Sequence, residues 1–219
     1  MAYTAPRMSA SLALTYAFAA ALVVGLLLKF WLASRQVRHV ARHRSVVPEA
    51  FANTITLAAH QKAADYTIAK SRFGIVEMAW STALLLGWTL LGGLDLLNRA
   101  LTDLLGGGMW QQLALLATFS LIGGLLELPF SLWQTFRLEE RFGFNKMTLR
   151  LWLADGFKGM LVGAIIGLPL AALILWLMGA AGARWWLWAW LVWVGFNLTL
   201  MLIYPTFIAP LFNKFQPLD

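Results

Sequence analysis

Two histidines one helical turn apart are the first residues whose types and spacing could do chemistry. His39 and His43 stand at i and i+4 in "HVARH", and this spacing places both on one helix face, as in zinc sites. The zincin motif H-E-x-x-H also needs a glutamate as general base, and Val40 occupies that position. Three arginines interleave with the pair and disfavour a divalent cation. We therefore interpret the segment as a basic helix beside anionic lipid headgroups, and the sequence gives no reason to bring the third histidine, His60, to it.

A single carboxylate stands inside a long apolar run. Glu127 lies in "LLELPF", two residues before Pro129, and an ionisable group at membrane depth is costly enough to suggest a function. One hypothesis is a group that faces a water-filled chamber. The other is a structural partner for a cation, or for backbone that a proline frees in another span. The sequence leaves both open.

Most of the remaining charge gathers in one stretch, "TFRLEERFGFNKMTLRLWLADGFKG", residues 135–159. It holds five basic and three acidic residues between two apolar runs. Gly143 and Asn145 are turn formers, and we expect Asn145 to cap a following helix. Apolar residues then recur at Leu149, Leu153 and Phe157, one helical face. The stretch therefore predicts a turn and an amphipathic elbow helix, pinned by ion pairs, that leads the chain back into the membrane.

The amino-acid composition indicates that membrane-spanning helices position these residues. The chain of 219 residues is 60% hydrophobic and 12% charged, whereas a soluble domain is about 25% charged. We conclude that it is an all-α integral membrane protein. The net charge of +7 lies in loops beside apolar runs, a pattern that favours membrane orientation over nucleic-acid binding. The chain has no cysteine, which excludes disulfides and thiolate metal sites.

About five transmembrane helices are predicted within a single membrane domain, residues 1–219. The expected spans are 8–33, 73–95, 109–136, 159–182 and 185–212, with a helical loop after the first. The loop between the first two spans holds seven Lys and Arg, that between the third and fourth holds five, and the other two connections hold one each. By the positive-inside rule the two basic loops are cytoplasmic, which places the N-terminus outside and the C-terminus in the cytoplasm. The Ala-, Arg- and Leu-rich composition suggests a bacterial inner membrane.

Three stretches together resemble a known family. They are "VPEAFANTITLAAHQKAADYTIAKSRF" at 47–73, "ELPFSLWQTFRLEERFGFNKMTLRLWLADGFK" at 127–158 and "YPTFIAPLFNKFQPLD" at 204–219. They are similar to the N-terminal membrane domain of the type I CAAX prenyl proteases, which are integral-membrane zinc metalloendopeptidases. The resemblance covers nearly the whole chain from about Gln36. In that family the H-E-x-x-H helix and a third, glutamate ligand follow the PLFNKF-type segment, and neither occurs in these 219 residues.

The resemblance implies that this chain is the membrane half of such an enzyme, truncated or split before the zinc motif and inactive alone. In the complete enzyme the spans would enclose a chamber, and zinc-activated water would cleave a peptide or membrane-protein substrate, possibly prenylated. The expected partners are the lipid bilayer, the missing C-terminal protease domain and that substrate, with no nucleic acid. No catalytic or metal-binding residue can be assigned in this chain. The residues expected to shape or brace the substrate entrance are Glu127, Glu139, Glu140, Arg141, Asn145, Asp155 and Lys158.

Two functions from other classes stay open on sequence alone. A stand-alone carrier or pore would use Glu127 and the proline-kinked spans to line a path, and it would carry flux in liposomes. A scaffold derived from a protease would instead co-purify with a full-length relative.

Overall fold

The computed structural model describes residues 10–212, and every regular element in that range is a helix. The contacts divide the chain into two compact units. The first comprises the described residues up to Leu96 together with Gly124–Lys146, and the second comprises Leu97–Gly123 and the described residues from Met147 onward.

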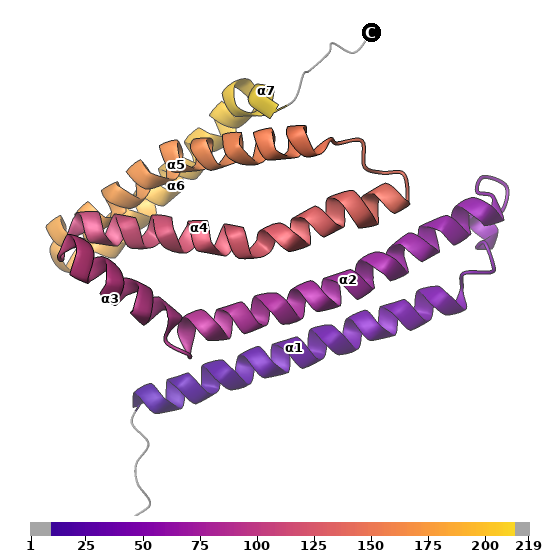
Figure 1. The fold of residues 1–219 in the computed structure, drawn as a ribbon, viewed down its shortest axis with the longest axis horizontal. Helices are drawn as coiled ribbons and strands as arrows, with labels where there is room; N and C mark the ends of the chain where they lie inside the picture. The colour runs from indigo at the N-terminus through magenta and orange to yellow at the C-terminus, as the bar shows by residue number, and fades with distance from the viewer. Residues whose placement is uncertain (1–9, 213–219) are drawn as a thin grey trace, which may run out of the picture. The chain divides into compact units, whose positions relative to one another are not determined.

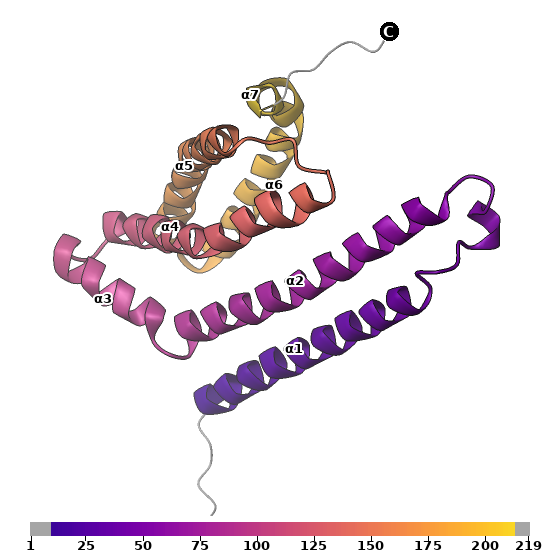
Figure 2. The ribbon, with the colours of Figure 1, turned by 45° about the vertical axis from the view of Figure 1, so that its right-hand side comes forward.

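The first unit is built on two long helices that lie side by side and antiparallel. They are α1, Ala10–Arg42, and α2, Leu57–Thr89 (Figures 1 and 2). The loop between them contains the short 3-10 turn Glu49–Phe51. Thr56 then starts α2, because its side chain accepts a hydrogen bond from the backbone N–H of Ala59, which would otherwise lack a partner.

A sharp bend separates α2 from the next helix, α3, Gly93–Leu105. The two helix axes differ by 50° across a break of three residues. Gly92 has a φ of +82°, and a Cβ on Gly93 would stand 2.8 Å from the carbonyl oxygen of Gly87. Glycine at both positions is what allows the chain to bend so tightly.

Helix α4, Met109–Trp133, crosses from the second unit into the first and keeps Pro129 inside it. A π-helical turn, Gln134–Glu139, continues it. In the second unit, α5, Leu149–Ala180, and α6, Trp185–Ile203, lie side by side and antiparallel (Figures 1 and 2). A second π-helical turn, Tyr204–Ile208, leads from α6 to α7, Ala209–Phe212.

The helices bear out the predicted membrane architecture. Four segments are long and apolar enough to cross a membrane: Leu12–Arg42, Met109–Glu139, Leu149–Ala180 and Gly182–Phe212. The bent pair α2 and α3 makes a fifth. The start of the first predicted span, residues 8–9, lies outside the described residues.

The helix ends differ from the predicted ones in two informative ways. Helix α2 begins at Leu57, well before the span predicted at 73–95, so most of the predicted basic loop is helical. The predicted elbow helix is the start of α5, which runs unbroken into the fourth span. The prediction that Asn145 caps this helix is wrong: the side chain of Thr148 accepts the hydrogen bond from the N–H of Leu151. A β-hydroxyl directly before the first turn is in the better position for a cap.

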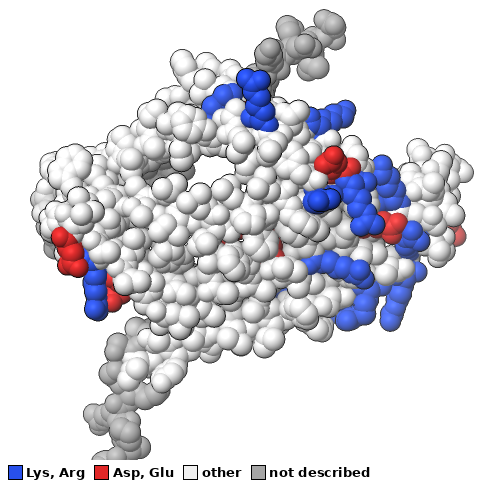
Figure 3. Space-filling view, in the orientation of Figure 1, with Lys and Arg blue, Asp and Glu red and all other residues white. Residues whose placement is uncertain are grey.

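Very little of the apolar surface is buried within the described residues. Among residues 10–212, only four apolar side chains are buried: Ala64, Leu138, Phe142 and Ala209. Long apolar side chains cover the outside of the helices, as expected where lipid and not water is the solvent. Figure 3 shows most of the Lys and Arg on the side where α1 and α2 meet their connecting loop.

Candidate functional site

The charged stretch that follows α4 is closed by a Schellman turn. The N–H of Phe144 donates to the carbonyl of Glu139 (2.9 Å), and the N–H of Gly143 donates to the carbonyl of Glu140 (3.0 Å). This is the paired pattern that satisfies the last carbonyls of a helix, and it needs a left-handed residue at the position of Gly143. Gly143 supplies it with a φ of +79°. The "RFGF" sequence is therefore a helix stop that fixes two phenylalanines on either side of the glycine.

Both phenylalanines pack against one tyrosine of α2. The ring of Tyr66 meets Phe142 edge-on at 5.2 Å and Phe144 edge-on at 4.9 Å, both with an interplanar angle of 71°. Phe142 is 7% exposed, and the neighbouring Leu138 is 3% exposed. Edge-to-face pairs of this kind add about 0.5–1.5 kcal/mol each beyond the area they bury. Tyr66 thus joins α2 to the turn, and we call Tyr66, Glu139, Phe142 and Phe144 the Tyr66 cluster.

The tyrosine hydroxyl completes the cluster by binding a carboxylate. Tyr66 Oη donates to Glu139 Oε1 at 2.7 Å, and Lys70 Nζ donates to the same hydroxyl at 3.2 Å. Glu139 is the last residue of the π-helical turn Gln134–Glu139. Such π-helical turns are often found at functional sites. A charged acceptor that is half-buried and already bonded resists rearrangement, since losing the partner leaves it unsatisfied.

Cations surround the rings of the cluster. Lys62 Nζ lies 5.9 Å from the ring centroid of Phe144, Lys70 Nζ lies 5.4 Å from that of Tyr66, and the guanidinium carbon of Arg141 lies 5.6 Å from that of Phe142. Contacts of this kind contribute about 0.5–1 kcal/mol where they are exposed. The arrangement gives this end of the first unit an aromatic centre with a positive rim.

A second tie holds the loop after α1 to α2. Arg44 makes a bidentate ion pair with Asp65, with N–O distances of 2.6 and 2.7 Å. Asp65 precedes the predicted second span. The hydrogen bonds from Arg44, helped by the charges of Arg44 and Arg141, lower the pKa of the Asp65 carboxyl. The loop is therefore fixed by a charge-assisted contact and not by buried apolar area.

Acid should release this tie only at low pH. Because the folded pKa of Asp65 lies below its unfolded value of about 3.9, its contribution is fully present above that value. It is lost as the pH falls through the folded pKa. We expect the Asp65 carboxyl carbon to titrate by NMR below the midpoint of about 3.9 that an unfolded aspartate shows. The Arg44→Gln variant should move the Asp65 midpoint upward. An unchanged midpoint would show that the ion pair does not form in solution.

The predicted entrance residues fall into three places. Glu139, Arg141 and Asn145 come together at the turn, where the N–H of Asn145 also points at the carbonyl of Glu139 (3.3 Å). The side chain of Glu140 is exposed, and its contribution to the turn is its backbone carbonyl. Glu127 stands twelve residues before Glu139 on the same helical run, about 18 Å away for an α-helical rise. The carboxylate of Glu127 accepts a hydrogen bond from Ser81 Oγ of α2 at 3.4 Å. The preceding residue of α2, Trp80, donates from Nε1 to the carbonyl oxygen of Leu126.

Asp155 and Lys158 belong to the second unit. Lys158 Nζ lies 3.3 Å from Asp155 Oδ1 and 3.4 Å from the carbonyl oxygen of Leu211. The pair thus connects the first turns of α5 to α7. It acts as a local tie between two helix ends, and the sequence did predict ion pairing in this segment.

The three histidines approach one another without forming a metal site. His43 Nδ1 lies 2.8 Å from the carbonyl oxygen of His39, and His60 Nε2 lies 3.0 Å from that of His43. A carbonyl oxygen only accepts, so His43 Nδ1 and His60 Nε2 act as donors here, and these two nitrogens are not the ones that could bind a metal. Within residues 10–212, no group of three or more His, Cys, Asp or Glu could hold a metal ion. The described residues therefore do not fit a zinc site.

Sequence reasoning missed Tyr66, Phe142 and Phe144 as members of the site. A signal was present in "HQKAADYTIAKSRF": Lys62, Tyr66 and Lys70 are spaced by four, and this spacing places them on one helix face with the ring between two cations. What the spacing did not show was the partner, because the turn that faces Tyr66 follows it by more than seventy residues.

Comparison with known proteins gives the cluster its context. A family model described as "CAAX prenyl protease N-terminal, five membrane helices" matches residues 36–214, which include both α2 and the turn. The chain belongs to the CAAX prenyl protease family. The five membrane helices of that description agree with the four apolar spans of the described residues and the bent pair α2 and α3 counted as a fifth.

Individual CAAX prenyl proteases are similar to this chain in sequence and in structure. The CAAX prenyl protease 1 homolog of Homo sapiens is 32% identical over 86% of this chain and 41% of its own length. That of Caenorhabditis elegans is 36% identical over 73% of this chain and 35% of its own. The crystal structure of S. mikatae Ste24p superposes with a TM-score of 0.83 at 27% identity, covering 91% of this chain and 48% of that protein. The chain therefore spans less than half the length of these relatives.

Proposed function

We propose that this membrane domain forms the chamber wall and the substrate entrance of a zinc metalloendopeptidase. The observation that carries the proposal is the Tyr66 cluster, which braces the turn at 139–145 against α2 within a domain of the CAAX prenyl protease family. In this proposal Glu139, Glu140, Arg141 and Asn145 shape the cytoplasmic side of the entrance, Glu127 lines its deeper part, and Asp155 and Lys158 brace α5. Its partners are the lipid bilayer and a peptide or membrane-protein substrate, possibly prenylated.

The catalytic chemistry is proposed to come from residues beyond these 219. No H-E-x-x-H sequence occurs in them, and the described residues do not fit a metal site. Zinc, when bound by a protease domain, would supply an activated water for peptide hydrolysis. The residues of this chain would bind and orient the substrate, and alone they would not hydrolyse it.

The whole reading frame tests this proposal. The frame should continue past the codon for Asp219 into an H-E-x-x-H sequence. The complete product should hold about one zinc per chain. It should also cleave a prenylated CAAX peptide, while the 219-residue chain should do neither. A stop codon after Asp219, with ion or solute flux from this chain in liposomes, would favour a carrier or pore. Co-purification with a full-length relative would favour a scaffold.

We further propose an orientation with the N-terminus outside, the C-terminus in the cytoplasm and a bacterial inner membrane as the location. The orientation is supported by the excess of Lys and Arg in the loops between the first two and the third and fourth spans, and the location is supported by the Ala-, Arg- and Leu-rich composition. Because the chain has no cysteine, single cysteines report topology without a background. A cysteine at Ala52 should react with an impermeant maleimide only from the cytoplasmic side, and one at Gly107 only from the outside. The reverse labelling pattern would contradict the orientation.

A further inference from the structure

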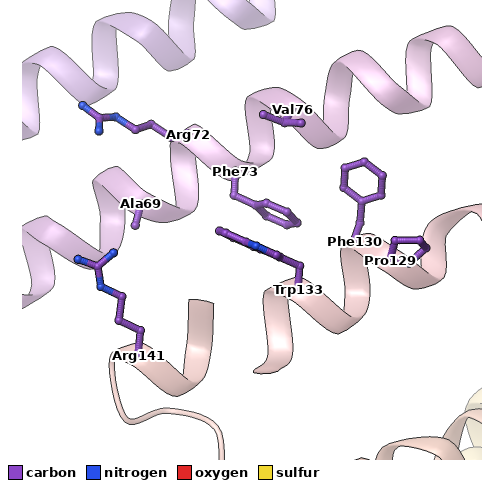
Figure 4. Close-up of a pocket in the computed structure, with 8 residues that line it drawn as sticks. All are labelled: Ala69, Arg72, Phe73, Val76, Pro129, Phe130, Trp133 and Arg141. Atoms are coloured by element: carbon purple, nitrogen blue, oxygen red, sulfur yellow. The ribbon is translucent and has the colours of Figure 1, made fainter. Parts of the chain in front are cut away.

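An apolar groove of about 550 Å³ opens within the first unit, between α2 and the second half of α4 (Figure 4). Phe73 and Val76 line it from α2, and Pro129, Phe130 and Trp133 line it from α4. Its size falls in the range of about 300–1,000 Å³ that small-molecule sites occupy. None of these residues belongs to the Tyr66 cluster, so the groove is a feature in its own right.

Stacked aromatic rings make one wall of the groove rigid. Phe73 stacks on Trp133 with 4.6 Å between centroids and an interplanar angle of 16°, and Phe130 lies 6.0 Å from Phe73 and 5.8 Å from Trp80. Figure 4 shows Phe73 and Trp133 face to face in the middle of the groove. A preformed wall lowers the ordering cost that a bound apolar chain would otherwise bring.

The groove carries positive charge at one end only. Figure 4 shows Arg72 and Arg141 at the same end, on either side of Ala69, with Val76, Phe130 and Pro129 at the other. Within residues 10–212, neither arginine forms an ion pair with a carboxylate. Asp65, the carboxylate whose pKa the hydrogen bond from Arg44 and, to a smaller extent, the charge of Arg141 lower, is already bound by Arg44. The guanidinium of Arg141 lies over the ring of Phe142 and keeps its hydrogen-bond donors for another acceptor.

We propose that this groove binds one anionic phospholipid, with its phosphate at the Arg72–Arg141 end and an acyl chain along Phe73, Trp133 and Phe130. Arginine recognises phosphate through paired hydrogen bonds, and basic pockets between membrane helices hold anionic headgroups. Arg72 directly precedes the predicted second span and Phe73 begins it, so the charge stands at headgroup level and the apolar wall at acyl level. A soluble anion would leave the apolar wall unused, and the ammonium of a zwitterionic lipid would be repelled by the two arginines.

The site does not depend on the proposed protease role, and only the choice of leaflet rests on the proposed orientation. That orientation places the arginines in the cytoplasmic leaflet, where anionic lipids attract basic residues. Failure of the protease proposal would leave lipid binding by this chain unchanged.

Native mass spectrometry of the detergent-purified chain tests the site directly. Phosphatidylglycerol and phosphatidylcholine are titrated separately, and Kd is taken from the fraction of the one-to-one adduct. The double variant Arg72→Gln/Arg141→Gln should weaken phosphatidylglycerol binding by about tenfold or more, because two charge-assisted contacts are lost. Phosphatidylcholine carries the same phosphate, but the arginines repel its ammonium. It should therefore bind the native chain more weakly and lose less than about twofold in the double variant. Val76→Trp, which fills the apolar end from an exposed position, should weaken phosphatidylglycerol binding with both arginines intact.

The matched control removes the same charge elsewhere. Arg38→Gln/Arg42→Gln takes two exposed arginines from α1 and should leave phosphatidylglycerol binding within about twofold. An equal loss in this control would show general attraction to basic residues and overturn the site. Unchanged binding in the Arg72/Arg141 variant would also overturn it. So would displacement of the lipid by inorganic phosphate at millimolar concentration, because that result would show a simple anion site.

Discussion

Replacing Tyr66 with alanine should lower the free energy of unfolding of the membrane domain by about 3–5 kcal/mol. The substitution removes two edge-to-face contacts, with Phe142 and Phe144, and leaves the buried Phe142 beside a cavity. It also removes the hydroxyl that donates to Glu139 at 2.7 Å, so a half-buried carboxylate loses its partner. The measurement is the unfolding midpoint in mixed micelles titrated with a denaturing detergent, followed by tryptophan fluorescence.

Two further variants separate the ring from the hydroxyl. Tyr66→Phe keeps both ring contacts and should lose about 1–3 kcal/mol through the unsatisfied Glu139 alone. Phe51→Ala, at an aromatic residue that is 53% exposed in the same unit, should change stability by less than about 0.5 kcal/mol. If Tyr66→Ala were no more costly than Phe51→Ala, the cluster would not hold the turn to α2.

Replacing Gly143 with valine should cost about 1–3 kcal/mol of stability, the second largest effect we expect. A φ of +79° is costly for any residue with a Cβ and most costly for a β-branched one. Space is not the reason, because the closest atom to a Cβ placed there is Lys62 Nζ at 3.9 Å, the end of a flexible side chain. The strain acts on the turn that carries Glu139, Phe142 and Phe144, so under the proposed function the variant should also lower turnover of the complete protein.

Conformational strain can be distinguished from added bulk at the same position. Gly143→Asn adds a side chain that tolerates the left-handed region, and it should recover most of the lost stability. Gly74→Val makes the same change within α2, where a Cβ meets no atom within 4 Å, and it should be neutral or slightly stabilising. Equal losses for Gly74→Val and Gly143→Val would show that the turn needs no left-handed residue.

The contacts that these variants test are the physical basis of the proposed entrance. The turn is held by backbone hydrogen bonds at one glycine, by two aromatic contacts and by one carboxylate on a tyrosine. A structure fixed by a few strong contacts on an otherwise lipid-facing surface should be sensitive at those residues and tolerant around them. Glu140, which is exposed and offers its backbone carbonyl, should accordingly tolerate neutral substitution better than Glu139.

The membrane architecture could be predicted because the bilayer constrains it locally. A span needs about 20 apolar residues whatever its neighbours are, so the runs at 8–33, 109–136, 159–182 and 185–212 were visible without any tertiary information. The family was likewise visible in contiguous motifs, of which "EERFGFNK" contains the turn. The helix boundaries were less accurate. Charged residues that end a span need not end a helix, and α2 therefore begins 16 residues before the span predicted from 73.

By itself the sequence determined the helical membrane class, the positions of the apolar segments and the need for a turn at Gly143. Each of these follows from residues close together in the chain. Only the tertiary structure decided that the turn closes on Tyr66, that Glu139 accepts the hydrogen bond from its hydroxyl, and that Phe73 and Trp133 form a groove with Arg72 and Arg141 at one end. Those contacts join α2 to the end of α4 across about sixty to eighty residues. They depend on which faces of two helices meet. Because lipid is as apolar as the helix surface, the sequence of an apolar face does not show which helix it packs against.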